Sequence, residues 1–183
     1  MSETNLVSLE KIKKGLPLLT VVTLLWMILY FTMQRTIRSY ANRPQNQISA
    51  DLARGLELGK PLEGLVPPGK VDLLKSEAVY VIIYDNEMKP LASNADLEGR
   101  IPIPPAGVFS YAREHHKNTL TWQPRRGVRE AIVLNFYGGE HPGFVLVGRS
   151  LREAENLISY IGNIILKGWI VSIVLTFLVC LML

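Results

Sequence analysis

The residues best suited to bind a ligand form an aromatic and arginine-rich cluster in the second half of the chain. Its members are Trp122, Arg125, Arg126 and Arg129, with Tyr84 and Tyr137 on neighbouring predicted strands. An arginine guanidinium is a planar fork that matches a carboxylate through two parallel hydrogen bonds. Trp and Tyr rings supply apolar walls that exclude water from such a site. These residue types therefore indicate a site for a small carboxylate.

A structural interpretation of the same residues stays open beside this one. Pro124 and Gly127 indicate a turn, which would leave Arg125 and Arg126 in solvent and Trp122 in the core of the domain. The predicted ligand-binding residues are Tyr84, Trp122, Arg125, Arg129 and Tyr137.

Motifs for catalysis and metal binding are missing from the sequence. It contains no Gly-rich phosphate loop, no nucleophile elbow and no paired metal motif. His115 and His116 are adjacent, so on a helix they point about 100° apart and cannot bind one ion from the same face. We therefore expect neither an enzyme nor a metal or cofactor site.

Charge and cysteine content exclude two further classes. Lys and Arg number 20 against 16 Asp and Glu, and the excess is spread along the chain. A nucleic-acid-binding protein would gather it into a patch or stripe, so we expect no nucleic-acid partner. Cys180 is the single cysteine, which excludes an intramolecular disulfide.

Two apolar stretches without charged residues, Gly15–Met33 and Gly168–Leu183, lie close to the two ends of the sequence. About 20 apolar residues cross a hydrocarbon core of about 30 Å as a helix. The first stretch has this length and ends in bulky residues where a signal-peptide cleavage site needs small ones, so we interpret it as an uncleaved signal anchor. The second reaches this length if residues before Lys167 enter the membrane and the lysine snorkels.

This pattern predicts a cytoplasmic tail at residues 1–14, transmembrane helices at 15–33 and 157–183, and a domain with membrane-proximal helices at 34–156. Basic residues flank the first span on both sides, so the positive-inside rule does not decide the orientation. Signal anchors with short basic tails usually keep the tail in the cytoplasm. The central domain is therefore expected outside, with membrane lipid around both spans.

The central part changes from helical to strand periodicity. Strands are predicted at Ala78–Asp85, Lys89–Ser93, Thr119–Gln123, Val128–Tyr137 and Gly143–Arg149. Helices are predicted at 48–56 and Ala106–Lys117, a loop at 59–69, and an interruption of the first long helix at Pro44. This order predicts an α+β domain with an antiparallel sheet of about five strands. One sheet face is apolar, and the other is expected to be partly open.

The helix before the second span carries a seam of apolar residues. Leu151, Ala154, Ile158, Ile161 and Ile165 recur at spacings of 3, 4, 3 and 4, as at the a and d positions of a coiled coil. This seam is a candidate interface of a homodimer or with a partner membrane protein. A single amphipathic helix packed on its own domain explains the same pattern.

Three stretches resemble a known family. YVIIYDNEMKPLASN, Tyr80–Asn94, resembles the first hairpin of extracytoplasmic PAS-like or Cache-like sensor domains. The stretch Trp122–Glu155 resembles their last three strands and the helix that re-enters the membrane, and GRSLREAE, Gly148–Glu155, looks like their exit segment in bacterial histidine kinases. The resemblance implies a PAS/Cache-like fold, a bacterial inner membrane, two-component signalling, and a ligand pocket on the sheet face.

Such receptors continue from the second span into an output module, which these residues do not contain, and a phospho-accepting His is absent from its usual place. The resemblance therefore implies a sensing or regulatory role without kinase activity. The alternative is a non-enzymatic accessory or scaffold subunit of a larger membrane complex.

Overall fold

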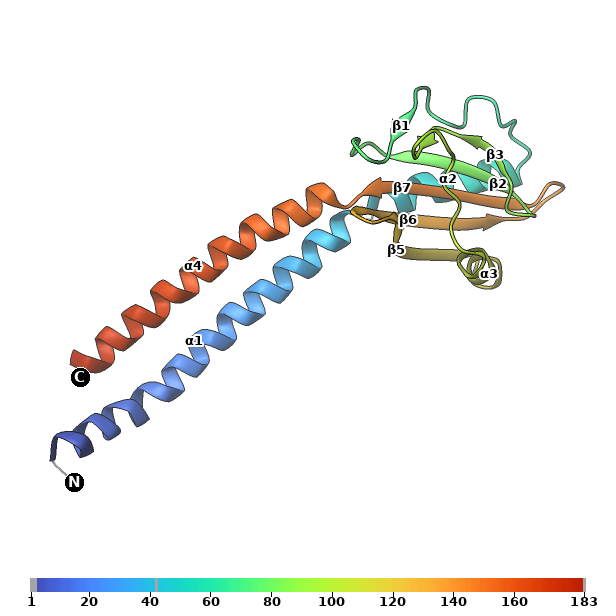
Figure 1. The fold of residues 1–183 in the computed structure, drawn as a ribbon. Coiled ribbons are helices and arrows are strands. Elements are labelled where there is room, and N and C mark those ends of the chain that lie inside the picture. The colour runs from blue at the N-terminus through green and yellow to red at the C-terminus, as the bar shows by residue number, and fades with distance from the viewer. Residues whose placement is uncertain (1–2, 42, 183) are drawn as a thin grey trace. The chain divides into compact units, whose positions relative to one another are not determined.

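The computed structural model describes residues 3–41 and 43–182, which form two units (Figure 1). One unit is a pair of long helices, up to Arg38 and from Glu155, and the other is a central domain, Ser39–Ala154. Positions 1, 2, 42 and 183, which the sequence analysis assigned to the tail, the domain and the second span, lie outside the described residues.

The helix pair consists of α1 (Glu3–Ala41) and α4 (Arg152–Met182). Both are long and apolar enough to cross a membrane. A Cβ atom on Gly168 would lie 2.4 Å from Cη2 of Trp26, so the indole ring of α1 packs directly on the glycine of α4. Small residues that allow such close approach are typical of helix contacts in lipid.

Two reciprocal hydrogen bonds join these helices. Nε1 of Trp26 donates to Oγ of Ser172 at 3.2 Å, and Nε1 of Trp169 donates to Oγ1 of Thr23 at 3.3 Å. Each helix thus offers one indole and one hydroxyl, three residues apart. Because the bonds cross in opposite directions, they set the register of the antiparallel pair.

The central domain is α+β, as the sequence predicts. Its elements are α2 (Arg43–Glu57), β1 (Val71–Asp72), β2 (Tyr80–Asp85), β3 (Pro90–Ser93), β4 (Ala95–Asp96), α3 (Ala106–His115), β5 (Lys117–Arg125), β6 (Val128–Tyr137) and β7 (Gly143–Ser150). The main sheet has five antiparallel strands in the order β3-β2-β7-β6-β5. The predicted strands and both predicted helices of the domain are therefore confirmed.

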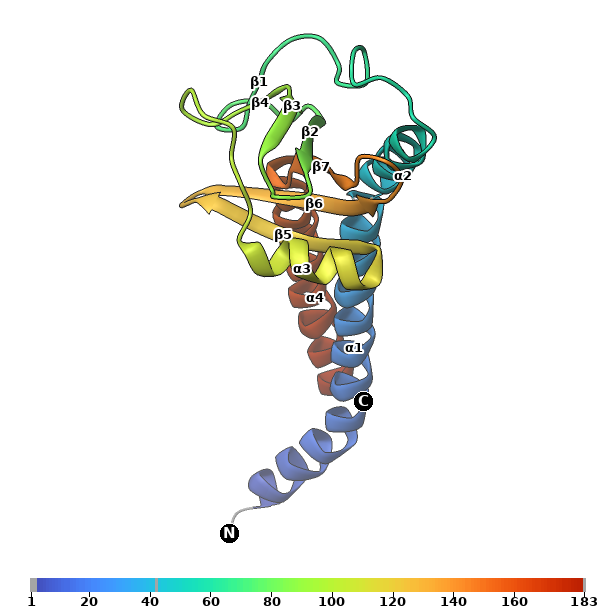
Figure 2. The same ribbon diagram turned by 90° about the vertical axis from the view of Figure 1, so that its right-hand side faces the viewer.

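Helices cover both faces of the sheet. Phe109 and Ala112 of α3 pack with Tyr84, Ile132 and other residues on one face. On the opposite face, α2 packs over Val145 and Val147. Figure 2 shows α3 beside β5, with α2 on the other side of the sheet.

The expectation of a partly open second face is wrong for the central strands. Ala131, Val133 and Asn135 are buried there, and Nδ2 of Asn135 donates to Oγ of Ser49 on α2 at 3.0 Å. On the edge strand β5, Thr119 and Thr121 are exposed on this face, whereas α2 packs mainly over β6 and β7.

Two details differ from the prediction. The sequence analysis assigns no element to the short parallel pair β1 and β4, because two-residue strands carry no detectable periodicity. The predicted helix to Lys117 ends at His115, because His116 takes a left-handed conformation (φ 62°) that caps α3. Lys117 then begins β5.

Substitution of Gly148 tests how tightly the core is packed. It lies opposite Tyr80 in the β2–β7 ladder, and an added Cβ would lie 2.3 Å from the phenol oxygen. Gly148→Ala is expected to destabilise the domain by about 1–3 kcal/mol through overpacking. Thermal and urea unfolding of the detergent-solubilised protein measure this.

Gly107→Ala is the matched control. Gly107 lies in α3 with no heavy atom within 4 Å of the added Cβ. We expect no loss of stability, and a gain of up to about 1 kcal/mol from helix propensity. Equal loss in both variants would contradict the packing role of Gly148.

Candidate functional site

A groove of about 680 Å³ is hollowed into the central domain, within the range of small-ligand sites. Two segments far apart in the sequence form its walls. Its lining residues are Leu97, Glu98, Arg100, Ile101, Pro102, Ile103, Pro105, Trp122, Gln123 and Pro124. One wall is therefore the proline-rich segment before α3, and the other is the end of the edge strand β5.

Proline spacing explains the shape of the first wall. A residue that precedes proline is held in an extended conformation, and proline fixes its own φ. Along Ile101–Pro105 the burial alternates, so that Pro102 and Pro104 are buried whereas Ile101 and Ile103 are 39% and 53% exposed. The segment thus turns its prolines inward and its isoleucines outward.

Of the five predicted ligand-binding residues, Trp122 lines this groove, and Tyr84 and Arg125 each contact one residue of its lining. The phenol of Tyr84 donates to the carbonyl oxygen of Pro102 at 2.8 Å and holds the first wall against the core. Trp122 lines the groove, and Arg125 forms an ion pair with Glu98 at the rim. Burial raises the pKa of the Tyr84 phenol, which keeps it a hydrogen-bond donor.

The other two predicted residues lie elsewhere. Arg129 is exposed on β6 and does not line the groove. Tyr137 packs in the core beneath α2, whereas Tyr84 packs in the core beneath α3, so the sheet separates them. The five residues therefore do not surround one carboxylate, and Glu98 already engages the guanidinium of Arg125. Carboxylate binding stays a prediction for the groove.

The predicted dimer seam also divides between the two units. Leu151 and Ala154 are half-buried in the central domain. Ile158 and Ile165 line a crevice of about 780 Å³ within the helix pair, together with Trp26 and other residues of α1. These two side chains face α1 of the same chain, so this seam is used at least partly within the chain. Dimerisation through it stays a prediction.

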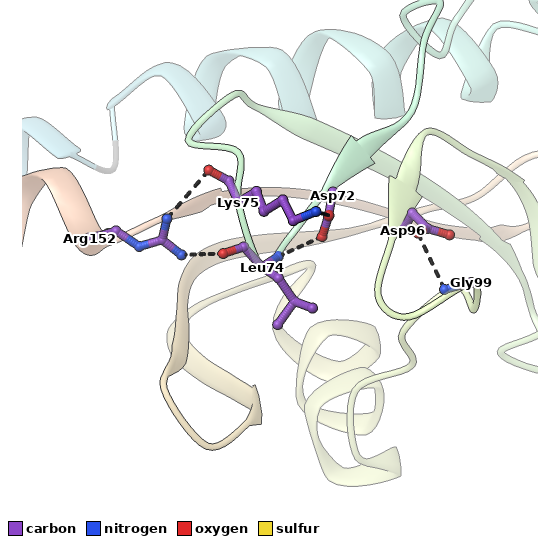
Figure 3. Close-up of polar contacts among 6 residues, drawn as sticks. All are labelled: Asp72, Leu74, Lys75, Asp96, Gly99 and Arg152. Carbon is purple, nitrogen blue, oxygen red and sulfur yellow. Dashed lines mark hydrogen bonds and ion pairs between the residues drawn. The ribbon is translucent and has the colours of Figure 1, made fainter.

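The connection from β7 to α4 is tied to the segment before β2 (Figure 3). The guanidinium of Arg152, the first residue of α4, donates to the carbonyl oxygens of Leu74 at 2.6 Å and Lys75 at 3.4 Å. Asp72 orders these acceptors, because its Oδ1 accepts from the backbone N–H of Leu74 at 2.9 Å. The start of α4 is thereby fixed to the turn after β1.

A second arginine reinforces this connection. Nε of Arg149 donates to the carbonyl oxygen of Glu77 at 3.0 Å, and the same guanidinium forms an ion pair with Glu153 in the first turn of α4. Arginine is suited to this arrangement because its rigid fork makes several hydrogen bonds at once. We call Arg149 and Arg152 the arginine clamp.

A buried acid lies between the groove and the clamp. Glu130 is 1% exposed, and within the described residues its Oε1 has no hydrogen-bond partner. Desolvation raises the pKa of this carboxyl from 4.5 to about 8, although the charge of Arg152 lowers it in part. The hydroxyl of nearby Tyr80 is also buried and unpartnered there, and desolvation and Glu130 raise its pKa. Burial therefore favours the protonated form of Glu130.

The sequence analysis missed Glu130, although strand parity carried a signal. Side chains two apart on a strand share a face, and Glu130 lies between Val128 and Ile132 on the face beneath α3. In the ladder Glu130 pairs with Trp122 on one side and Ser150 on the other. One cross-strand row therefore links the groove to the last residue of β7.

Glu130 makes the stability of the domain depend on pH. The unfolded chain releases this proton near pH 4.5 and the folded chain near pH 8, so the folded state binds more protons between these values. The contribution of Glu130 to stability is therefore fully present below pH 4.5 and is lost as the pH rises to about 8, by at most about 1.4 kcal/mol per pH unit. Glu130→Gln is expected to remove this slope and to be more stable than the original protein above pH 8.

Thermal unfolding of the detergent-solubilised protein at a series of pH values measures the effect. Glu140→Gln, at an exposed loop position, is the control and should follow the original profile. A Glu130→Gln variant that keeps the original slope would show that another group is responsible.

Comparison with known proteins adds no second source of information about this site. No protein-family model, curated protein or solved structure matches the chain. Within the part of the chain that the structure describes, no three His, Cys, Asp or Glu residues gather where they could hold a metal ion.

Proposed function

We propose that this protein is a membrane-anchored sensor or sensor-like regulatory protein. Its central domain binds a small ligand or a partner in the groove and transmits the binding event through α4 to the helix pair. The observation that carries this proposal is the exit of the chain from the sheet. Strand β7, which pairs with both β2 and β6, passes through the single residue Leu151 into α4.

The register of the sheet supports transmission from groove to helix. Trp122 in the groove pairs with Glu130, and Glu130 pairs with Ser150 at the end of β7. Oγ of Ser150 accepts from the backbone N–H of Arg152 at 3.3 Å, at the start of α4. A ligand that displaces Trp122 would therefore act on the helix through one row of paired residues.

The membrane location is supported by the apolar character of both helices. Each contains a window with a mean hydropathy of at least 2.0, and the reciprocal indole–hydroxyl bonds satisfy polar groups that lipid cannot. We propose a double-pass protein of the bacterial inner membrane with the central domain outside. A five-stranded antiparallel sheet flanked by helices is also the architecture that a PAS-like or Cache-like sensor domain implies.

An accessory or scaffold subunit is the second candidate. The exposed isoleucines at the groove favour it, because an apolar surface of this kind suits a docked protein as well as a small ligand. The two functions differ in transmission. A sensor changes hydrogen exchange at the start of α4 when the groove is occupied, whereas a scaffold leaves it unchanged.

Membrane anchoring predicts how the full chain fractionates. Expressed in bacteria, it should stay in the membrane pellet after an alkaline carbonate wash, because two apolar helices hold it in lipid. Protease added to spheroplasts should cleave the exposed loop at 58–70. Release by carbonate would contradict anchoring, and cleavage only after lysis would reverse the proposed orientation.

Substitution of Arg152 tests the connection between the central domain and α4. Arg152→Ala removes charge-assisted hydrogen bonds to two carbonyl oxygens, each worth about 1.5–3 kcal/mol. The backbone N–H groups of Lys75 and Ser76 donate to the carbonyl oxygen of Asp72. In the variant, these amides and those of the first turn of α4 are expected to exchange at least about tenfold faster. Hydrogen exchange with mass spectrometry measures both segments.

Arg126→Ala, in the exposed turn between β5 and β6, is the matched control for loss of one arginine. It should leave both segments unchanged. If Arg152→Ala also leaves them unchanged, the clamp does not hold the helix and the proposed route of transmission fails.

A further inference from the structure

The two walls of the groove both present unpaired backbone. Strand β5 is one of the two edges of the main sheet, and β6 is its single strand partner among the described residues. On the opposite wall, the backbone N–H and C=O groups of Ile101 and Ile103 make no hydrogen bond within the part of the chain described. An unpaired edge of this kind is a template for another strand.

The prolines prepare the first wall for this role. Pro102 and Pro104 have no N–H, so they leave no unsatisfied donor against the domain. The carbonyl oxygen of Pro102 is already used by Tyr84. Ile101 and Ile103 each keep one donor and one acceptor free. The prolines thus hold the segment against the domain, and the backbone groups of Ile101 and Ile103 are free to form hydrogen bonds with a bound strand.

Side chains around the groove define what would fit. Ile101 and Ile103 are exposed beside Trp122, so apolar side chains of a bound segment would be covered there. The rim carries the Glu98–Arg125 ion pair and Arg100. The exposed guanidinium of Arg100 has no partner in the described residues. Exposed salt bridges contribute little, so an incoming carboxylate can compete for Arg125. A partner with flanking acidic residues therefore fits best.

We propose, building on the proposed function, that the groove binds an extended peptide segment of another protein, which lies as an added strand between β5 and Ile101–Pro105. Its main chain pairs with both walls, its apolar side chains cover the exposed isoleucines, and an acidic residue at its end pairs with Arg100. Strand addition of this kind draws affinity from main-chain hydrogen bonds and specificity from alternate side chains.

Charge argues against a second copy of this chain as the occupant. The edge strand that a second copy would offer begins with Lys117 and ends with Arg125, and the proline wall begins at Arg100. Like charges placed opposite each other on paired strands are destabilising. The first wall spans five residues, so the paired part of the peptide is about 16 Å long.

The probe is the acetylated and amidated peptide Asp-Thr-Val-Thr-Val-Thr-Val-Asp, titrated against the full-length protein in detergent. Two further versions carry N-methyl groups on the valines or on the threonines, which removes the donors of one edge at a time. Each is expected to bind at least about tenfold more weakly, because a strand between two walls uses both edges. Full affinity in either version would overturn the proposal.

Variants of the protein test the same contact from the other side. Ile103→Asp should weaken the peptide at least about tenfold, since Ile103 is exposed and its replacement leaves the core intact. Leu91→Asp, at a similarly exposed apolar position on β3, should bind as the original protein does. Arg100→Glu should weaken the Asp-flanked peptide and strengthen a Lys-flanked one. Equal loss in Ile103→Asp and Leu91→Asp, or no reversal with Arg100→Glu, would contradict the assignment.

Sedimentation of the detergent-solubilised protein separates a peptide partner from a second copy. Self-association that Ile103→Asp abolishes would assign the groove to a second copy and overturn the proposal. If no peptide binds, but membrane association resists carbonate and Arg152→Ala has its expected effect, the peptide-binding proposal is wrong. The proposed function is then unaffected.

Discussion

Burial of the central strands on both faces is the constraint from which the rest of the domain follows. Residues of β2, β6 and β7 alternate between two apolar cores, one beneath α3 and one beneath α2. A strand buried in this way cannot shift its register without moving apolar side chains from one core into the other. The pairing of Trp122, Glu130 and Ser150 is consequently a defined row across three strands. Groove and helix exit are attached to the two ends of that row.

Glu130 places an ionisable group in the core beneath α3, and burying it has an energetic cost. A buried carboxyl with an unpartnered oxygen destabilises the domain when charged, and it is kept neutral by desolvation. Arg152 is close enough to act on it electrostatically but is engaged by two backbone carbonyls. The charge of Arg152 therefore acts on both the buried acid and the turn after β1, at the place where the sheet becomes a helix.

The two units solve the problem of unpaired polar groups in opposite ways. In the helix pair, the indole N–H groups of Trp26 and Trp169 find hydroxyl partners on the facing helix, as a helix pair in lipid requires. In the central domain, the backbone groups of the exposed residues Ile101 and Ile103 make no hydrogen bond within the described residues.

Composition and periodicity by themselves determined the two apolar helices, the α+β class and the five strands of the main sheet, because these depend on local patterns of apolar residues. Tyr84 and Tyr137 looked equivalent in sequence. Only the tertiary structure decided that they lie on opposite sides of the sheet, that Glu98 engages Arg125, and that Ile101–Pro105 faces β5. These relations join residues far apart in the chain, and their geometry follows from the order of strands and the placement of helices, which no local pattern specifies.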